Sequence, residues 1–118
     1  RQLLVLHSKL LLKRAHAGRA IFVTSGAAAN PRAYWGPYAA SKAALEALVK
    51  TWAMELANTP VRVNLLSPGR VRTAMRAKAY PGEDPATVPR PEDIAQRFLD
   101  LASAELTETG QVFGVTRT

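Results

Sequence analysis

Hydrophobic residues change their spacing several times along the 118-residue chain, and each change predicts a different element. Near the N-terminus, leucines follow helical spacing while lysines occupy another face. We therefore expect an amphipathic helix over residues 1–17, ended by Gly18. A secretory signal fits less well, because His7, Ser8 and Lys9 interrupt the apolar run that a signal needs.

Two short apolar runs predict strands on either side of a long helix. Ala20–Ser25 is apolar nearly throughout, which is typical of a strand buried on both faces of a parallel sheet. Val61–Leu66 predicts a second strand, ended by a Pro-Gly turn. Between them, an alanine-rich stretch from about Pro37 to about Ala57 predicts a helix. Strand, helix and strand in this order predict a βαβ unit with parallel strands.

The long helix carries an apolar stripe with two polar members. At about 100° per residue, six side chains fall within one narrow arc, which should face the core. A lysine in a buried stripe usually has a partner, so its presence points to chemistry. The six residues are Tyr38, Lys42, Leu45, Val49, Trp52 and Leu56.

The rest of the chain is less regular. Prolines and a glycine interrupt residues 70–91, so we expect a loop or lid there, with a short helix near Thr73–Lys78. Pro91 and the two acids after it predict a helix that runs to about Ser103. Gln111–Val115 predicts a last strand, which makes the fold class α/β.

Composition limits the class of protein without deciding its function. With 47% hydrophobic and 21% charged residues, the chain is an ordinary globular one, and residues 1–118 should form a single domain. The absence of cysteine excludes disulfides and thiolate metal sites. No apolar run is long enough to cross a bilayer, so we expect no membrane partner and a cytoplasmic location. The net charge of +7 suggests nucleic acid, but the basic residues are scattered and no nucleic-acid motif accompanies them, so we expect no nucleic acid.

Tyr38 and Lys42 form a Tyr-x-x-x-Lys pair on one helical face. Residues four apart on a helix are neighbours, so the ammonium can lie near the phenol and favour its ionised form. Such a tyrosine can give a proton to a substrate oxygen or take one from it. The spacing alone is common by chance, and an ordinary tyrosine beside a solvated lysine is the alternative.

Two strand ends add to this pair. Ser25 ends the first strand at its carboxyl end, where parallel sheets bind ligands, and its hydroxyl could hold a substrate carbonyl. Pro68 and Gly69 end the second strand at the same edge, and glycine lets backbone approach a flat ligand closely. A serine that caps a loop and a plain turn are the alternatives.

In combination these segments resemble the short-chain dehydrogenase/reductase family, within the classical subgroup that carries Tyr-x-x-x-Lys. The resemblance runs from Gly18 to about Val115 and implies the C-terminal, catalytic half of a Rossmann-like, doubly wound parallel sheet. The segments that carry it are Gly18–Ser25, Tyr38–Ala44, Val63–Gly69 and Thr73.

The resemblance implies hydride transfer between NAD or NADP and a small carbonyl or alcohol substrate. By similarity, Ser25 would hold the substrate oxygen and Tyr38 would be the general acid and base. Lys42 would favour the tyrosinate and bind the nicotinamide ribose. The residues that would line the nicotinamide are Pro68, Gly69, Val71 and Thr73.

The resemblance also implies surroundings for this site. Ala74–Pro89 would form a substrate lid, and Tyr34 and Trp35 would be pocket walls. Family members form homodimers or homotetramers, so we expect one of these. A basic cluster in the lid either meets the cofactor pyrophosphate or an acidic substrate, or is simply solvated; it comprises Arg70, Arg72, Arg76 and Lys78.

The chain departs from the family in three places. It has no Gly-rich phosphate loop near its start, no residue that would discriminate NAD from NADP, and no catalytic asparagine before Gly18; Gly110 and Gly114 precede no helix and do not replace the loop. We therefore expect a single partial domain that lacks the N-terminal cofactor-binding half and is inactive by itself. A non-catalytic Rossmann-like binding or regulatory module is the alternative function, and sugar epimerases, which share Tyr-x-x-x-Lys, leave the reaction type open.

Overall fold

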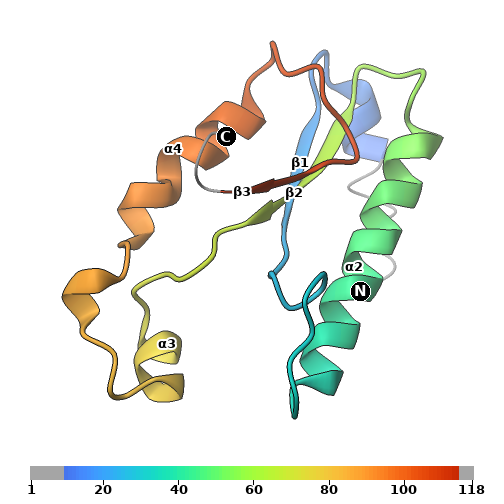
Figure 1. The fold of residues 1–118 in the computed structure, drawn as a ribbon. Coiled ribbons are helices and arrows are strands. Elements are labelled where there is room, and N and C mark those ends of the chain that lie inside the picture. The colour runs from blue at the N-terminus through green and yellow to red at the C-terminus, as the bar shows by residue number, and fades with distance from the viewer. Residues whose placement is uncertain (1–9, 115–118) are drawn as a thin grey trace.

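The computed structural model describes residues 10–114, in which three strands form one sheet with helices on both faces (Figure 1). The strands are β1 (Arg19–Val23), β2 (Arg62–Ser67) and β3 (Val112–Gly114), side by side in that order. Both pairings are parallel. The predicted α/β class and the βαβ order are therefore confirmed.

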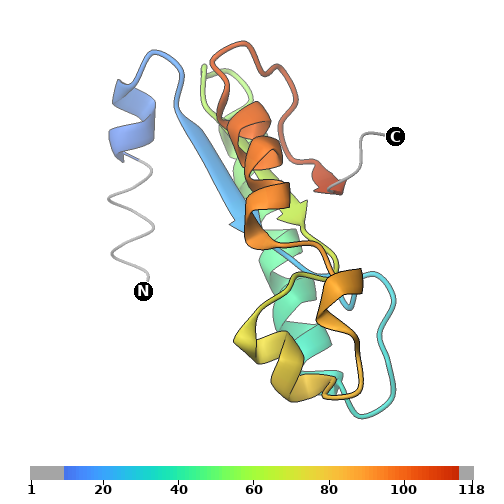
Figure 2. The same cartoon turned by 90° about the vertical axis from the view of Figure 1, so that its left-hand side faces the viewer.

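Two longer helices enclose the sheet. The helix α2 (Gly36–Glu55) covers one face, and α4 (Pro91–Ala102) covers the other (Figures 1 and 2). The short helix α3 (Ala74–Ala79) and the 3-10 turn η1 (Pro85–Thr87) lie beyond the carboxyl end of β2. For the three strands and for α2, α3 and α4, each observed boundary lies within about two residues of the predicted one, which is the usual uncertainty at element ends.

The predicted N-terminal helix falls partly outside the described residues, which begin at residue 10. Residues 10–14 are helical, and a bend and a turn separate them from Gly18. A Cβ on Gly18 would lie 2.6 Å from the carbonyl oxygen of Leu12, so the close approach of the chain here requires glycine. Within residues 10–114, no helix is both long enough and apolar enough to cross a membrane.

The hydrophobic core lies between α2 and β2. Phe22 of β1 meets Trp52 of α2 edge to face, with 6.1 Å between ring centroids. Each fully buried valine or leucine contributes about 1.5–3 kcal/mol through the area it removes from water. The buried cluster consists of Val49, Trp52, Leu56, Val61, Val63 and Leu65.

Two expectations about burial are wrong. The first strand was predicted to be buried on both faces, but β1 is mostly half-buried and Val23 is 44% exposed, because β1 lies at the edge of the sheet that residues 10–114 form. The stripe on α2 is buried only from Val49 onward, and Tyr38 is 41% exposed. The first turns of α2 extend past the end of β1 (Figure 1), so the sheet does not cover Tyr38.

Candidate functional site

The carboxyl ends of β1 and β2 lie side by side, where parallel sheets place their ligands. Val23 at the end of β1 pairs with Leu66 of β2. The amide of Thr24 continues the ladder and donates to the carbonyl oxygen of Leu66 at 2.9 Å. Ser25 follows β1, and Pro68 follows β2, at this same edge, as the sequence predicted.

Ser25 lies two residues beyond β1 rather than at its end, and it is half-buried in a tight turn. Its carbonyl oxygen accepts from the amide of Ala28 at 3.0 Å, and its Oγ accepts from the amide of Ala27 at 3.3 Å. The serine therefore shapes the loop, as one of the alternatives held. Its hydroxyl proton has no acceptor within residues 10–114, so it can be donated to a ligand.

Tyr38 and Lys42 lie one turn apart at the start of α2. Trp35 contacts the Tyr38 ring edge to face, with centroids 5.7 Å apart. The Nζ of Lys42 lies 5.9 Å from the centroid of the Tyr38 ring and donates to the carbonyl oxygen of Val23 at 3.1 Å. The ammonium thus lies near both the Tyr38 ring and the end of β1. The Tyr38 hydroxyl has no hydrogen-bond partner in the described part of the chain.

The segment after β2 turns sharply and then starts a helix. Gly69 has a φ of 69°, and a Cβ there would meet nothing within 4 Å, so backbone conformation rather than space favours glycine. Val71 is half-buried. Thr73 caps α3, because its side chain accepts from the amide of Arg76 at 3.1 Å. In this structure Thr73 is therefore a helix cap, and its predicted contact with a cofactor stays a prediction.

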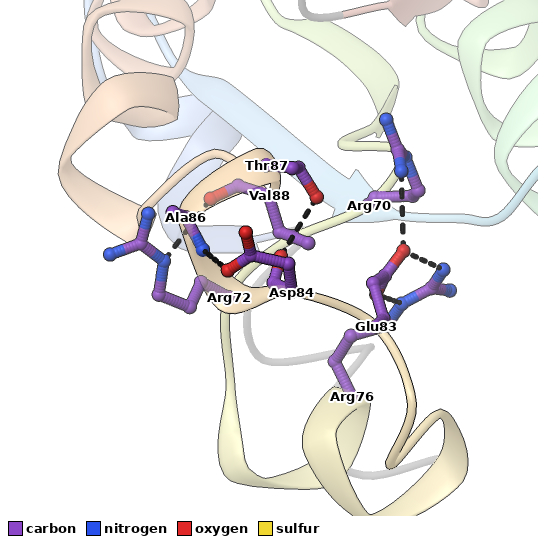
Figure 3. Close-up of polar contacts among 8 residues, drawn as sticks. All are labelled: Arg70, Arg72, Arg76, Glu83, Asp84, Ala86, Thr87 and Val88. Atoms are coloured by element: carbon purple, nitrogen blue, oxygen red, sulfur yellow. Dashed lines mark hydrogen bonds and ion pairs between the residues drawn. The ribbon is translucent and has the colours of Figure 1, made fainter.

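The predicted lid is closed at its base by Arg72 (Figure 3). The amide of Arg72 donates to the carbonyl oxygen of Pro89 at 2.7 Å, and its Nε donates to that of Val88 at 3.2 Å. These bonds join the two ends of the segment. Arg72 is thus hydrogen-bonded to backbone carbonyl oxygens of the predicted lid segment.

Glu83 is the central acceptor of the predicted lid segment, where its carboxylate binds two arginines (Figure 3). Arg76 donates to both carboxylate oxygens, at 2.7 and 3.0 Å, and Arg70 donates at 3.2 Å. The guanidinium of Arg76 also stacks on the ring of Tyr80 at 3.7 Å. The hydrogen bond from Arg76, together with that from Arg70, lowers the pKa of the Glu83 carboxyl.

These contacts revise the second interpretation of the basic cluster. Arg70 and Arg76 share one carboxylate and are not simply solvated, while Lys78 is exposed. The Arg70 side chain is 57% exposed and gives one hydrogen bond here, so contact of the cluster with a pyrophosphate or an acidic substrate stays a prediction. The sequence analysis missed Glu83. The available signal was a pair of adjacent acids, Glu83 and Asp84, placed seven and eight residues after Arg76 in an otherwise basic segment.

Two aromatic residues precede α2. Tyr34 has a φ of 68° and a fully exposed side chain, and Trp35 is 38% exposed. A non-glycine residue in the left-handed region stores about 1–3 kcal/mol, and such strain occurs often at functional sites. Their predicted role as pocket walls stays a prediction.

Comparison with known proteins decides the family. The family model described as short chain dehydrogenase matches residues 3–84. The chain belongs to the short-chain dehydrogenase/reductase family. Residues 3–84 include β1, α2, β2 and α3, and with them the candidate site residues from Ser25 to Thr73.

Individual relatives agree with this family. An uncharacterized oxidoreductase of Escherichia coli K12, YciK, is 41% identical over 104 residues, which cover 87% of this chain and 41% of that protein. The 3-oxoacyl-[acyl-carrier-protein] reductase FabG of Thermotoga maritima is 41% identical over 87 residues, or 66% of this chain and 35% of that protein. A putative short chain dehydrogenase of Escherichia coli CFT073, crystallised with NADPH, superposes with a TM-score of 0.90 at 38% identity, over 98% of this chain and 48% of that one.

These comparisons bear on two further points. The chain spans less than half the length of the relatives and structures that it matches. The family match over residues 3–84 takes in neither α4 nor β3 and conflicts with the expectation that the chain is the C-terminal half of the fold, from Gly18 to about Val115. We therefore withdraw that assignment. The parallel sheet and the Rossmann-fold neighbours remain.

Proposed function

We propose that this chain carries the catalytic side chains of an NAD(P)-dependent oxidoreductase, which transfers hydride between a nicotinamide and a small carbonyl or alcohol substrate. The observation that carries the proposal is the position of the Lys42 ammonium, which lies 3.1 Å from the carbonyl oxygen of Val23 and 5.9 Å from the centroid of the Tyr38 ring. Ser25 lies two residues after Val23, so we assign three side chains with complementary chemistry to this one edge of the sheet. The NADPH-bound neighbour and the reductase among the relatives support the same class of reaction.

The donors at this edge fit a ribose. Lys42 has three protons on Nζ and gives one to Val23, which leaves two for hydroxyl oxygens. The Tyr38 hydroxyl is free within the described residues. We assign the ribose to these two side chains and the lining of the nicotinamide to four residues after β2. When bound, the nicotinamide supplies or accepts the hydride. The four lining residues are Pro68, Gly69, Val71 and Thr73.

The chain's own residues transfer the proton and stabilise the negative charges that form on oxygen atoms during the reaction. Ser25 donates a hydrogen bond to the substrate oxygen and so stabilises negative charge that develops there. Tyr38 gives its proton to that oxygen during reduction and takes one during oxidation. The Lys42 ammonium stabilises the tyrosinate that this transfer leaves.

Replacement of the phenol tests the assignment. In the full-length protein, Tyr38→Phe should lower kcat by about 10²–10⁴-fold, because it removes the proton donor. The free energy of NADPH binding should change by no more than about 1 kcal/mol, the net value of one hydrogen bond. The measurement is NADPH or NADH oxidation with a panel of aldehydes, ketones and quinones, beside fluorescence titration with NADPH.

A pair of serine variants provides the control. Ser25→Ala should lower kcat by about 10²-fold, the usual effect of losing one oxyanion donor. Ser103→Ala should leave kcat unchanged, because Ser103 follows α4 at the other end of β1, where its carbonyl oxygen accepts from Arg19. Turnover retained in Tyr38→Phe would show that this tyrosine is not the acid and base.

A non-catalytic module is the second candidate. It is favoured by the structural use of two candidate residues, since Ser25 shapes its loop and Thr73 caps α3. Saturable NADPH binding by the full-length protein without reduction of any panel substrate would support it. We also propose that the 118-residue chain alone has no turnover, because its sequence contains no Gly-rich loop for the pyrophosphate.

We further propose a cytoplasmic homodimer or homotetramer. Leu48 and Met54 of α2 are 55% and 71% exposed, which suits a helix that packs against a second copy. Light scattering on the full-length protein tests the oligomeric state, and a monomer at micromolar concentration would contradict it.

A further inference from the structure

Side chains of α2 form hydrogen bonds with two consecutive residues at the end of β1. The carbonyl oxygen of Val23 accepts from Nζ of Lys42 at 3.1 Å, and Oγ1 of Thr24 donates to Oε1 of Glu46 at 2.8 Å. Lys42 and Glu46 are four residues apart, so they project from the same face of α2. Together the two bonds form a clasp between strand and helix.

The two bonds of the clasp have opposite polarity. The helix donates at Lys42 and accepts at Glu46, while the strand accepts at Val23 and donates at Thr24. Successive strand residues point to opposite faces, so a slip of one residue would turn the Thr24 hydroxyl away from α2. The clasp therefore specifies one register of the strand end against the helix.

Burial makes the Thr24 bond costly to lose. Thr24 is 3% exposed, and the side chain of Glu46 is 16% exposed. A buried hydroxyl or carboxylate that loses its partner keeps its desolvation penalty without compensation. The second carboxylate oxygen of Glu46 lies 3.9 Å from Nζ of Lys50, which orients the carboxylate from the solvent side.

We propose that Glu46 and Thr24 are positioning residues for the reaction: their hydrogen bond fixes the end of β1, and with it the Ser25 hydroxyl, against the Tyr38 face of α2. Ser25 follows Thr24 directly, so a displaced Thr24 carries Ser25 with it. The proposal rests on the proposed function, because it assigns the clasp a value for catalysis. Thr24 and Glu46 act through the position of Ser25 and do not themselves contact the substrate.

The first test measures position without requiring turnover. Thr24→Val keeps the side-chain shape and removes the donor. The amides of Ala28 and Asn30 bond to the carbonyl oxygens of Ser25 and Gly26, at 3.0 and 2.9 Å. In native-state hydrogen exchange these two amides should exchange at least about tenfold faster in Thr24→Val than in the wild type.

A matched threonine serves as the control. Thr51 lies on the exposed face of the same helix, and its Oγ1 donates to the carbonyl oxygen of Ala47 at 2.9 Å. Thr51→Val therefore removes one hydroxyl hydrogen bond from α2 without touching the clasp. It should leave the exchange of Ala28 and Asn30 unchanged.

The second test measures catalysis with NADPH and the most active carbonyl compound of the panel. Thr24→Val and Glu46→Ala should lower kcat by about tenfold, because a small misplacement of a catalytic group has large effects on rate, while KM for NADPH stays within about twofold. Glu46→Gln should stay within about twofold of the wild type in kcat, because its amide oxygen still accepts from Thr24. A residue that only stabilised the fold would not lower kcat while leaving KM unchanged. It would also not regain its kcat when glutamine replaces alanine at position 46.

The outcomes separate the two proposals. If Tyr38→Phe retains turnover, the proposed function fails, and the exchange measurement still decides whether the clasp positions Ser25. If Thr24→Val leaves both exchange and kcat at wild-type values, the positioning role is refuted. If Thr24→Val does not fold, Glu46→Ala takes its place in both tests. A tenfold loss of kcat in Glu46→Gln would show that the hydrogen bond from Thr24 is not what positions Ser25.

Discussion

Arg19 offers the most direct test of how this fold is held together. Its guanidinium donates five hydrogen bonds, all to backbone carbonyl oxygens, which uses every donor that an arginine has. The acceptors lie in three segments that are distant in sequence: the start of β1, the approach to β2 and the loop after α4. They belong to Gly18, Pro60, Ser103, Ala104 and Leu106.

The magnitude follows from the exposure of these bonds. Those to Ser103, Gly18 and Leu106 are partly buried, at 2.8, 2.9 and 3.1 Å, and each contributes about 1 kcal/mol net. The bonds to Pro60 and Ala104 are exposed and add little. Burial, and after it the charge of Arg62, lowers the pKa of Arg19, which shows that desolvation and repulsion offset part of the gain. We therefore expect Arg19→Met to lower the free energy of unfolding by about 2–3 kcal/mol.

Urea unfolding of the full-length protein, followed by circular dichroism, measures this loss. Arg32→Met is the matched control, because Arg32 is exposed and the substitution changes the net charge equally. Arg19→Lys should recover only part of the loss, about 1 kcal/mol, because one ammonium cannot reach all three segments. A value for Arg19→Met within about 0.5 kcal/mol of Arg32→Met would refute the reasoning, since surface substitutions fall in that range.

Two further predictions concern carboxylates with lowered pKa values. Hydrogen bonds from Arg76 and Arg70 lower the pKa of Glu83 below 4.5, so the stabilisation of the lid is present above that pH and is lost as the pH falls through the lowered pKa. The protection factors of the amides of residues 76–88, which correct for the slower intrinsic exchange in acid, should therefore fall as the pH is lowered, and Glu83→Gln, which is less protected at neutral pH, should lose that pH dependence; the same profile in both proteins would contradict the role of the Glu83 contacts. Asp93 accepts from the amide of Arg90 at 2.7 Å at the start of α4, and this bond, with those of the Arg90 side chain, lowers its pKa. Asp93→Ala should lower the midpoint of urea unfolding, and an unchanged midpoint would show that the cap contributes nothing.

Local spacing accounts for the part of the fold that was predicted correctly. Three of the six residues of β2 are apolar, and the alanine-rich stretch forms α2 as expected. Tyr38 and Lys42 meet because they are four apart on one helix, and that separation is visible in the sequence. The short-chain dehydrogenase/reductase family could be inferred from these same segments.

Burial could not be predicted in the same way. The apolar run of β1 reads as a doubly buried strand, yet Val23 is 44% exposed because β1 is an edge strand among the described residues. The helical arc that contains Tyr38 reads as buried, yet α2 extends past the sheet at that end. Periodicity states which side chains share a face, but not how far the covering element reaches.

The sequence by itself determined which segments become strands and helices, which residues share a helix face, and which family the chain joins, because each of these depends on neighbours along the chain. Only the tertiary structure decided that Lys42 bonds the Val23 carbonyl, that Thr24 meets Glu46, and that Arg19 reaches Ser103 across 84 positions. A backbone carbonyl is the same in every residue, so no letter of the sequence marks it as the acceptor. Its partner is chosen only when packing brings the two segments together.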